Sequence, residues 1–234
     1  MKNLSIPLAI VVAGFLVSGA IIFSNSMDSK KNANSATGGN VDNSADNIEN
    51  TDAMDNIKPV SADDHIRGSL EAEVVVVEFS DFQCPFCQSF HSTMVRVIDD
   101  YNGRVAWVYR HFPLDSIHPK ARKQAQGAEC VAELGGNDAF WAYADKIFSG
   151  QNPELSQLSS IAQSVGLSSS SFQSCLDSGK YDAEVAKDLN DATASGGNGT
   201  PYSVVISKNG SKYVINGAQP YEVVKQIIDD ALGI

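Results

Sequence analysis

A chain of 234 residues with 43% hydrophobic content can bury one sizeable core, so we expect one domain with an insertion. The formal net charge of -11 and the pI near 4.7 argue against nucleic acid as a partner, because phosphates require Lys and Arg clusters that this sequence lacks. We therefore expect proteins or small thiols as partners.

The N-terminal segment 4–23 is mostly aliphatic and uncharged. About twenty such residues suit either a signal peptide or a membrane-spanning helix. Residues 1–23 are thus interpreted as a signal anchor or signal peptide. The segment exceeds a usual signal-peptide core, which favours an uncleaved anchor, whereas small residues at 18–20 and 24–26 leave cleavage open. Both interpretations predict export, and the anchor also predicts membrane attachment.

Residues 24–56 are rich in Asn, Ser, Asp, Gly and Ala, and they contain almost no aromatic or β-branched residues. Such a composition cannot bury enough apolar surface to fold, so it predicts a disordered polar linker. The globular domain is then expected over residues 57–234.

A strand and a helix meet at the sequence CPFC. Residues 74–79 are mostly apolar and β-branched, which is typical of a central strand covered on both faces. Apolar residues recur at helical spacing after Cys87, so a helix is expected to follow with Cys84 at its N-terminus. A second strand over residues 104–109 completes a βαβ unit.

The middle of the chain is expected to be helical from about residue 116 to 195. Helical spacing is present, between glycine interruptions, over residues 118–134, 138–148, 153–165, 168–176 and 181–194. Two strands, 203–207 and 212–215, then flank an Asn-Gly pair that favours a hairpin. An amphipathic helix over 220–232 ends the chain.

This order of elements, with its motifs, resembles the DsbA-like branch of the thioredoxin fold over residues 63–234. The motifs that carry the resemblance are EFSDFQCPFC (78–87), HFPLDSIHPKA (111–121) and GTPYSVVI (199–206). The resemblance implies an α/β architecture, namely a thioredoxin fold with an inserted all-helical subdomain.

The two cysteines of CPFC suit thiol–disulfide exchange. Unpaired N–H groups and the positive dipole end of a helix stabilise a thiolate at Cys84, which is therefore the expected nucleophile. Cys87 lies one turn deeper and is the expected resolving thiol. Pro85 fits the first helical turn, and Pro85 and Phe86 are expected to contact the substrate.

Three further residues complete the expected site. Glu78 interrupts the apolar strand, so it is expected to be buried and to exchange a proton with Cys87, although an exposed position at the strand end is the alternative. Asp81 is expected to be solvated. By resemblance, the bond between Thr200 and Pro201 is cis, the Thr200 backbone pairs with the substrate, and Pro201 shields the sulfurs from metal.

Two other classes of function remain open at this stage. Cys84, Cys87 and His91 fall on one side of a helix and would suit zinc, but His91 is more simply a solvent-facing residue and a fourth ligand is not evident. A redox-inactive, chaperone-like binder would not need both thiols. We expect no metal and no organic cofactor.

Cys130 and Cys175 bring the number of cysteines to four. Both lie in the expected helical insertion, and an oxidising compartment favours a structural disulfide between them. Two buried, unpaired thiols are the alternative.

The sequence thus predicts an exported, membrane-anchored thiol–disulfide oxidoreductase, a monomer that introduces disulfides into secreted or cell-envelope proteins. By resemblance, a membrane-bound reoxidase restores its disulfide. Phe86 stands where a histidine often supports the thiolate, and Thr200 is also found in isomerase and reductase branches, so these activities are the alternatives. Dimeric isomerases carry a folded N-terminal dimerisation domain where this sequence has only the polar linker, which favours the oxidase.

Overall fold

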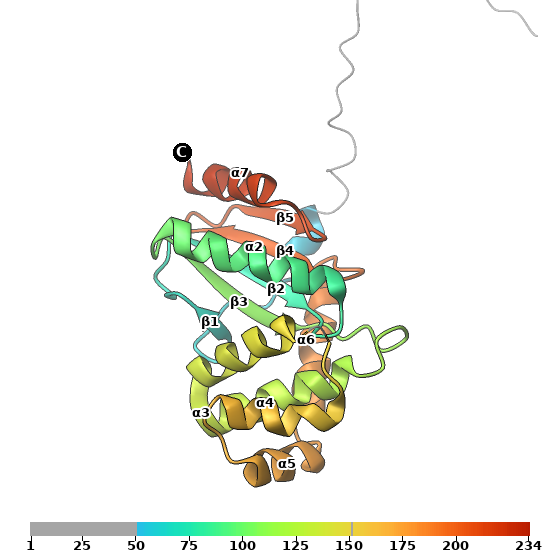
Figure 1. The fold of residues 1–234 in the computed structure, drawn as a ribbon. Coiled ribbons are helices and arrows are strands. Elements are labelled where there is room, and N and C mark those ends of the chain that lie inside the picture. Colours follow the sequence, from blue (N-terminus) through green and yellow to red (C-terminus); the bar gives the residue numbers. More distant parts are fainter. Residues whose placement is uncertain (1–50, 151) are drawn as a thin grey trace, which may run out of the picture. The chain divides into compact units, whose positions relative to one another are not determined.

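The computed structural model describes residues 51–150 and 152–234, so the predicted anchor or signal peptide and most of the predicted linker lie outside the described residues. Five strands form a single sheet: β1 (His65–Arg67), β2 (Val74–Ser80), β3 (Val105–His111), β4 (Tyr202–Ser207) and β5 (Lys212–Asn216). The helices are α1 (Thr51–Met54), α2 (Pro85–Tyr101), α3 (Ala121–Ser149), α4 (Leu158–Ser164), α5 (Ser169–Ser178), α6 (Asp182–Ala194) and α7 (Tyr221–Leu232), with a 3-10 turn η1 (Leu155–Gln157) before α4 (Figure 1). No described helix has the length and apolar character needed to cross a membrane.

The sheet has the strand order β1-β3-β2-β4-β5. Its centre, β2, pairs in parallel with β3 and antiparallel with β4, while β1 and β5 form the antiparallel edges. The helix α2 connects β2 to β3, as expected for a βαβ unit.

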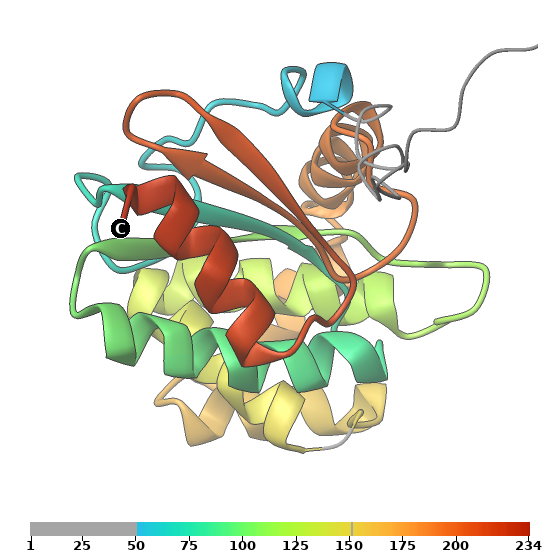
Figure 2. The ribbon, with the colours of Figure 1, turned by 90° about the horizontal axis from the view of Figure 1, so that it is seen from above.

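Both faces of β2 are covered, which explains its nearly continuous apolar sequence. Val74 and Val76 join a core cluster with residues of α2 and α7, whereas Val77 and Phe79 join a second cluster that contains Met54 and residues of α6. Figure 2 shows α2 and α7 on one face of the sheet and α1 and α6 on the other.

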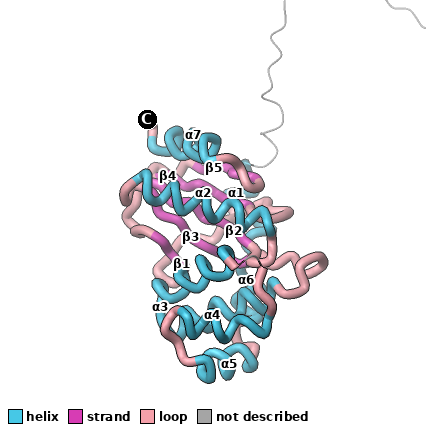
Figure 3. Tube along the Cα trace, in the orientation of Figure 1, coloured by secondary structure: helices cyan, strands magenta, loops and turns pink. Residues whose placement is uncertain are grey.

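The helices α3 to α6 lie between β3 and β4, and α3, α4 and α5 form a helical layer of their own (Figure 3). The predicted thioredoxin fold with an inserted helical subdomain is thus confirmed. A disulfide joins Cys130 of α3 to Cys175 of α5, with an S–S distance of 2.00 Å. It ties two helices of the insertion together.

Two boundaries differ from the sequence prediction. The ordered domain includes residues 51–56, which composition places in the linker: Met54 and Ile57 are buried against the sheet, but a four-residue helix is too short to show in a composition window. The two helices expected over 118–134 and 138–148 form the single run α3, interrupted at Gly136, whose φ of 78° and ψ of -173° are not helical.

Candidate active site at the start of α2

The dithiol motif occupies the first turn of α2. Cys84 is the N-cap residue with extended backbone angles, Pro85 is the first helical residue, and the N–H of Gln88 donates to the Cys84 carbonyl at 3.1 Å. Both thiols are free in this structure. Cys84 is 4% exposed and Cys87 is fully buried, so only Cys84 presents an accessible edge to another sulfur.

The surroundings of Cys84 favour its thiolate. A hydrogen bond from the Cys87 thiol is the largest influence and lowers the pKa of Cys84 to about 6, even though burial acts in the opposite direction. The backbone N–H groups of Cys87 and Phe86, together with Thr200, act in the same direction as the thiol. Cys84 is therefore mainly a thiolate at neutral pH, which is the reactive form in disulfide exchange.

Cys87 has the opposite character. Burial is the main cause that raises its pKa well above the ordinary value, and its hydrogen bond to Cys84 and the nearby charges of Cys84 and Glu78 add to the rise. The backbone N–H of Asp81 donates to Cys87 Sγ at 3.4 Å. Cys87 thus stays protonated at neutral pH and must lose a proton before it can attack.

Glu78 lies inside the domain rather than at an exposed strand end, with an exposed fraction of 1%. Trp107 Nε1 donates to its Oε2 at 2.9 Å, while Oε1 has no hydrogen-bond partner among the described residues. Burial raises the pKa of Glu78 to about 7, although Ser80 and Trp107 limit the rise. A carboxyl group with this pKa can both accept and release a proton near neutral pH.

The loop before β4 completes the site. The peptide bond between Thr200 and Pro201 is cis, and Cys84 Sγ lies 3.5 Å from the Thr200 carbonyl oxygen. Pro201 is buried, whereas the Phe86 side chain is 65% exposed next to the nucleophile. The structure therefore brings Cys84, Cys87 and Thr200 together, and it leaves Cys130 and Cys175 apart in the helical insertion.

The expectation that His91 faces solvent is wrong. His91 is 6% exposed, its Nε2 lies 2.7 Å from Asp145 Oδ1, and its ring packs against Trp107 and Phe148. Because α3 covers this side of α2, the imidazole is already committed to a carboxylate. The hypothesis of a zinc site formed by the two cysteines and His91 therefore loses one of its three ligands.

The expectation that Asp81 is solvated is also wrong. Asp81 is 1% exposed, and its carboxylate accepts hydrogen bonds from the N–H groups of Gln83 at 2.7 Å and Leu114 at 2.8 Å, with His118 Nδ1 at 2.8 Å. The segment after β3 folds back over the dithiol turn and buries this carboxylate. Sequence reasoning missed this role, although the motif HFPLDSIHPKA contains His118.

Together, the fold and the dithiol site are those of a DsbA-like thiol–disulfide oxidoreductase. The sequence profile of the family described as thioredoxin matches residues 60–230, and the chain belongs to this family. The resemblance to DsbA-like proteins seen in the sequence is confirmed.

Solved structures agree with this assignment. The crystal structure of DsbA2 from Pseudomonas aeruginosa superposes with a TM-score of 0.61 and 25% identity, covering 74% of this chain and 96% of that chain. BdbD from Bacillus subtilis, in its oxidised form, superposes with a TM-score of 0.63 and 24% identity, covering 73% of this chain and 94% of that chain. The α-DsbA1 of Wolbachia pipientis superposes with a TM-score of 0.66 and 19% identity, covering 77% of this chain and 96% of that chain. The last two show the fold alone.

Curated relatives carry a different name. A protein called Na(+)/H(+) antiporter NhaA 3, from Salinispora tropica, is 36% identical over 151 residues, which cover 63% of this chain and 22% of that protein. Na(+)/H(+) antiporter NhaA 1 from Mycolicibacterium vanbaalenii is 34% identical over 149 residues, which cover 62% of this chain and 24% of that protein. This chain thus spans about a quarter or less of the relatives' length, so no transport property follows for it.

Proposed function

We propose that this chain is an exported thiol–disulfide oxidoreductase that acts mainly as an oxidase on reduced, unfolded exported proteins. The observation that carries the proposal is the contrast between the two thiols: the pKa of Cys84 is lowered to about 6, while that of Cys87 is raised. A stabilised Cys84 thiolate favours the reduced form of the enzyme, so its disulfide is the better oxidant.

The proposed reaction starts from the Cys84–Cys87 disulfide. A substrate thiolate attacks Cys84 Sγ, the S–S bond breaks, and its electron pair passes to Cys87 Sγ, which takes a proton from Glu78. A second substrate thiolate then attacks the substrate sulfur of the mixed disulfide. Cys84 leaves as a thiolate, and its lowered pKa makes it a good leaving group. The substrate gains a disulfide, and the enzyme gains two electrons.

Substrate contacts are proposed around the nucleophile. The exposed Phe86 ring offers an apolar surface, and the backbone of Thr200 beside Cys84 Sγ offers hydrogen bonds to an extended chain. Pro85 is also exposed at the helix start, while Pro201 is buried, and we propose that it covers the sulfurs. Such contacts suit unfolded chains, which can reach the thiols without a fixed shape.

Two features support the proposal that the protein is exported. The apolar segment 4–23 suits a signal peptide or an anchor, and the Cys130–Cys175 disulfide suits an oxidising compartment. We therefore place the catalytic domain of a monomer outside the cytoplasm, attached to the membrane through its N-terminal segment. A membrane-bound reoxidase is proposed to remove the two electrons after each turnover.

Substrate trapping tests the roles of the two thiols. Cys87→Ser should accumulate mixed disulfides with substrate proteins that carry a disulfide, because Cys84 can attack one substrate sulfur and expel the other as a thiolate, but no thiol then resolves the complex. Cys84→Ser should accumulate none. Gel analysis of alkylated samples under non-reducing conditions measures both variants, and equal trapping by the two would overturn the assignment.

An isomerase or reductase role is the second candidate, favoured by Thr200 before the proline and by the absence of a charge on Phe86. The reduction potential of the Cys84–Cys87 couple separates an oxidase from a reductase. Equilibration with glutathione should give a potential nearer to the ~-120 mV of DsbA than to the ~-270 mV of thioredoxin if the protein is an oxidase. A value near that of thioredoxin would favour the second candidate.

A further inference from the structure

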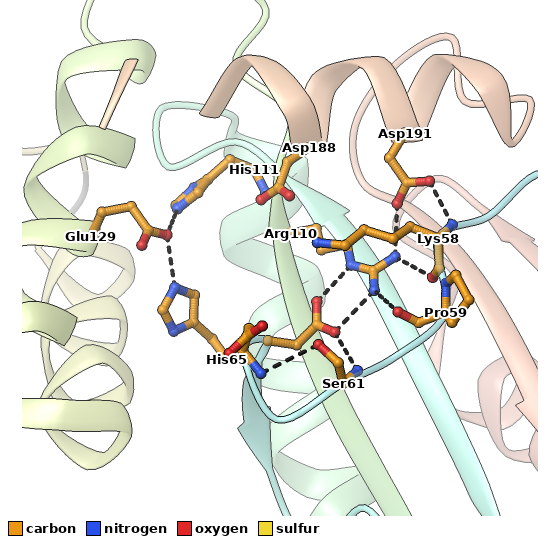
Figure 4. A network of polar contacts seen from close by, with 11 residues as sticks. Lys58, Pro59, Ser61, His65, Arg110, His111, Glu129, Asp188 and Asp191 are labelled. Carbon is orange, nitrogen blue, oxygen red and sulfur yellow. Dashed lines mark hydrogen bonds and ion pairs between the residues drawn. The ribbon is translucent and has the colours of Figure 1, made fainter. Parts of the chain in front are cut away.

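A second polar cluster lies outside the dithiol site, where β1, the end of β3 and α3 meet (Figure 4). His65 Nε2 and His111 Nε2 lie 2.7 Å and 2.9 Å from the same atom, Glu129 Oε1. The ligand atoms of the three residues all lie within 4.8 Å of one another. His111 is 1% exposed and Glu129 is 8% exposed, so this is an interior cluster and not a group of surface charges.

The surroundings of this cluster have an excess of negative charge. The buried Arg110 pairs with Asp64 at 2.8 Å and with Asp191 at 2.7 Å, so its single charge is already matched. Asp188 is 9% exposed and accepts the backbone N–H of His111 at 3.0 Å. In the described structure no Lys or Arg pairs with Asp188 or Glu129. A buried carboxylate without a cation is unfavourable, so a cation here would stabilise the fold.

There is room for such an ion's water ligand. A cavity of about 30 Å³ lies beside this cluster. It is lined by His65, Tyr109, Lys58 and five carboxylates, which are Asp63, Asp64, Glu129, Glu184 and Asp188. This volume is enough for one water molecule with polar partners. Most of the charged groups that line it are carboxylates, which favours a metal-bound water over an anion.

We propose that His65, His111 and Glu129 bind one divalent transition-metal ion of the zinc type. Imidazole nitrogen and carboxylate oxygen form a donor set that suits zinc and its neighbours, whereas Ca²⁺ and Mg²⁺ prefer oxygen alone. Three protein ligands and one water give four-coordination. Tetrahedral bonds of about 2.0 Å separate ligand atoms by about 3.3 Å, so each histidine nitrogen needs to move away from Glu129 Oε1 by only about half an ångström.

The three ligands come from separate elements. His65 lies on the edge strand β1, His111 ends β3, and Glu129 belongs to α3 of the helical insertion. An ion at this place would fix the insertion to the sheet. The ion would also help to hold the end of β2, which precedes the dithiol motif, because the N–H of Phe112, next to His111, donates to the Ser80 carbonyl at 2.8 Å. We therefore assign the ion a structural role.

The test uses oxidised protein, because the Cys84–Cys87 disulfide then cannot ligate metal. Chelator-stripped protein is titrated with Zn²⁺ by calorimetry and with Co²⁺ by visible absorption. We expect one ion per chain and a Tm that rises on Zn²⁺ addition. His65→Ala and Glu129→Gln should weaken binding about tenfold or more. His118→Ala, which removes a histidine outside the cluster, should bind as the wild type does.

The proposal is overturned if oxidised wild type binds no Zn²⁺, or if His65→Ala binds as tightly as His118→Ala does. Should Glu129→Gln fail to fold, His65→Ala decides alone, because the His65 side chain is 14% exposed at the sheet edge.

Discussion

The carboxyl group of Glu78 has a pKa of about 7 because β2 carries it into the interior beneath α2. Its partner, the Trp107 indole, donates only one hydrogen bond, which is too little to replace water around a carboxylate. The group that is proposed to exchange a proton with Cys87 therefore also opposes folding whenever it is ionised.

This opposition gives a pH-dependent prediction for Glu78→Gln. In the folded protein Glu78 keeps its proton up to about pH 7, whereas in the unfolded chain it loses it near the ordinary value of 4.5. The folded state thus binds more protons between these values, and wild-type stability falls as the pH rises through this window. The ionised carboxylate costs on the order of 3 kcal/mol above pH 7, and Glu78→Gln should recover much of this.

Urea unfolding of both proteins at pH 4 and pH 8 measures this effect. The stability gain of the variant should be confined to pH 8, since the amide carbonyl introduced by Glu78→Gln can still accept from Trp107 in both conditions. In the variant, Cys87 should also attack a mixed disulfide at Cys84 more slowly, because the Cys87 thiol loses its proposed proton acceptor. An identical difference in stability at both pH values would show that Glu78 has an ordinary pKa.

Glu78 and Asp81 show what the sequence can and cannot predict about single residues. Glu78 interrupts an apolar strand, so its burial follows from a local pattern. Asp81 stands after the strand and looks like a loop residue. Its burial depends on Leu114 and His118, which the chain brings back from more than thirty residues away, and no local pattern contains this contact.

Among the elements, the helical insertion depends most on a covalent link. The Cys130–Cys175 disulfide joins α3 to α5 and closes a loop of 45 residues. Closing a loop of this length removes entropy from the unfolded chain and contributes about 4 kcal/mol in the chain-entropy estimate.

Replacing both cysteines by alanine should therefore lower the free energy of unfolding by about 4 kcal/mol. Chemical denaturation of the oxidised proteins measures the change. The Cys84 and Cys87 couple should keep its reduction potential, since the disulfide lies in a different part of the domain. A potential that shifts together with stability would show that the insertion influences the dithiol site.

The elements differ in how well the sequence predicted them. The long amphipathic helix α2 and the central strand β2 follow from periodicity, and Asn209 and Gly210 correctly predict the hairpin of β4 and β5. The edge strand β1 has only three residues, which is too short for a period. It is ordered by pairing with β3, so only the folded sheet defines it.

In the molecule as a whole, redox state and folding stability are linked through Cys84. Its pKa is lowered from 9.0 to about 6 in the folded, reduced protein, whereas the unfolded chain keeps the ordinary value. A lowered pKa contributes stability that is complete above pH 9 and is lost as the pH falls through 6. The oxidised protein has no thiol at this position and no such contribution.

The stability of the reduced protein relative to the oxidised one should consequently rise between pH 5 and pH 8. Over this range Cys87 stays mainly protonated in both states, because its pKa is raised in the fold and has the ordinary value of 9.0 in the unfolded chain. Guanidinium unfolding, with the Cys130–Cys175 disulfide kept intact, measures the difference at the two pH values. The reduced Cys84→Ser variant is the control and should show no such rise. A reduced wild type that gains nothing relative to the oxidised protein on going to pH 8 would mean that the Cys87 thiol and the helix terminus do not stabilise the Cys84 thiolate, and the oxidase proposal would lose its physical basis.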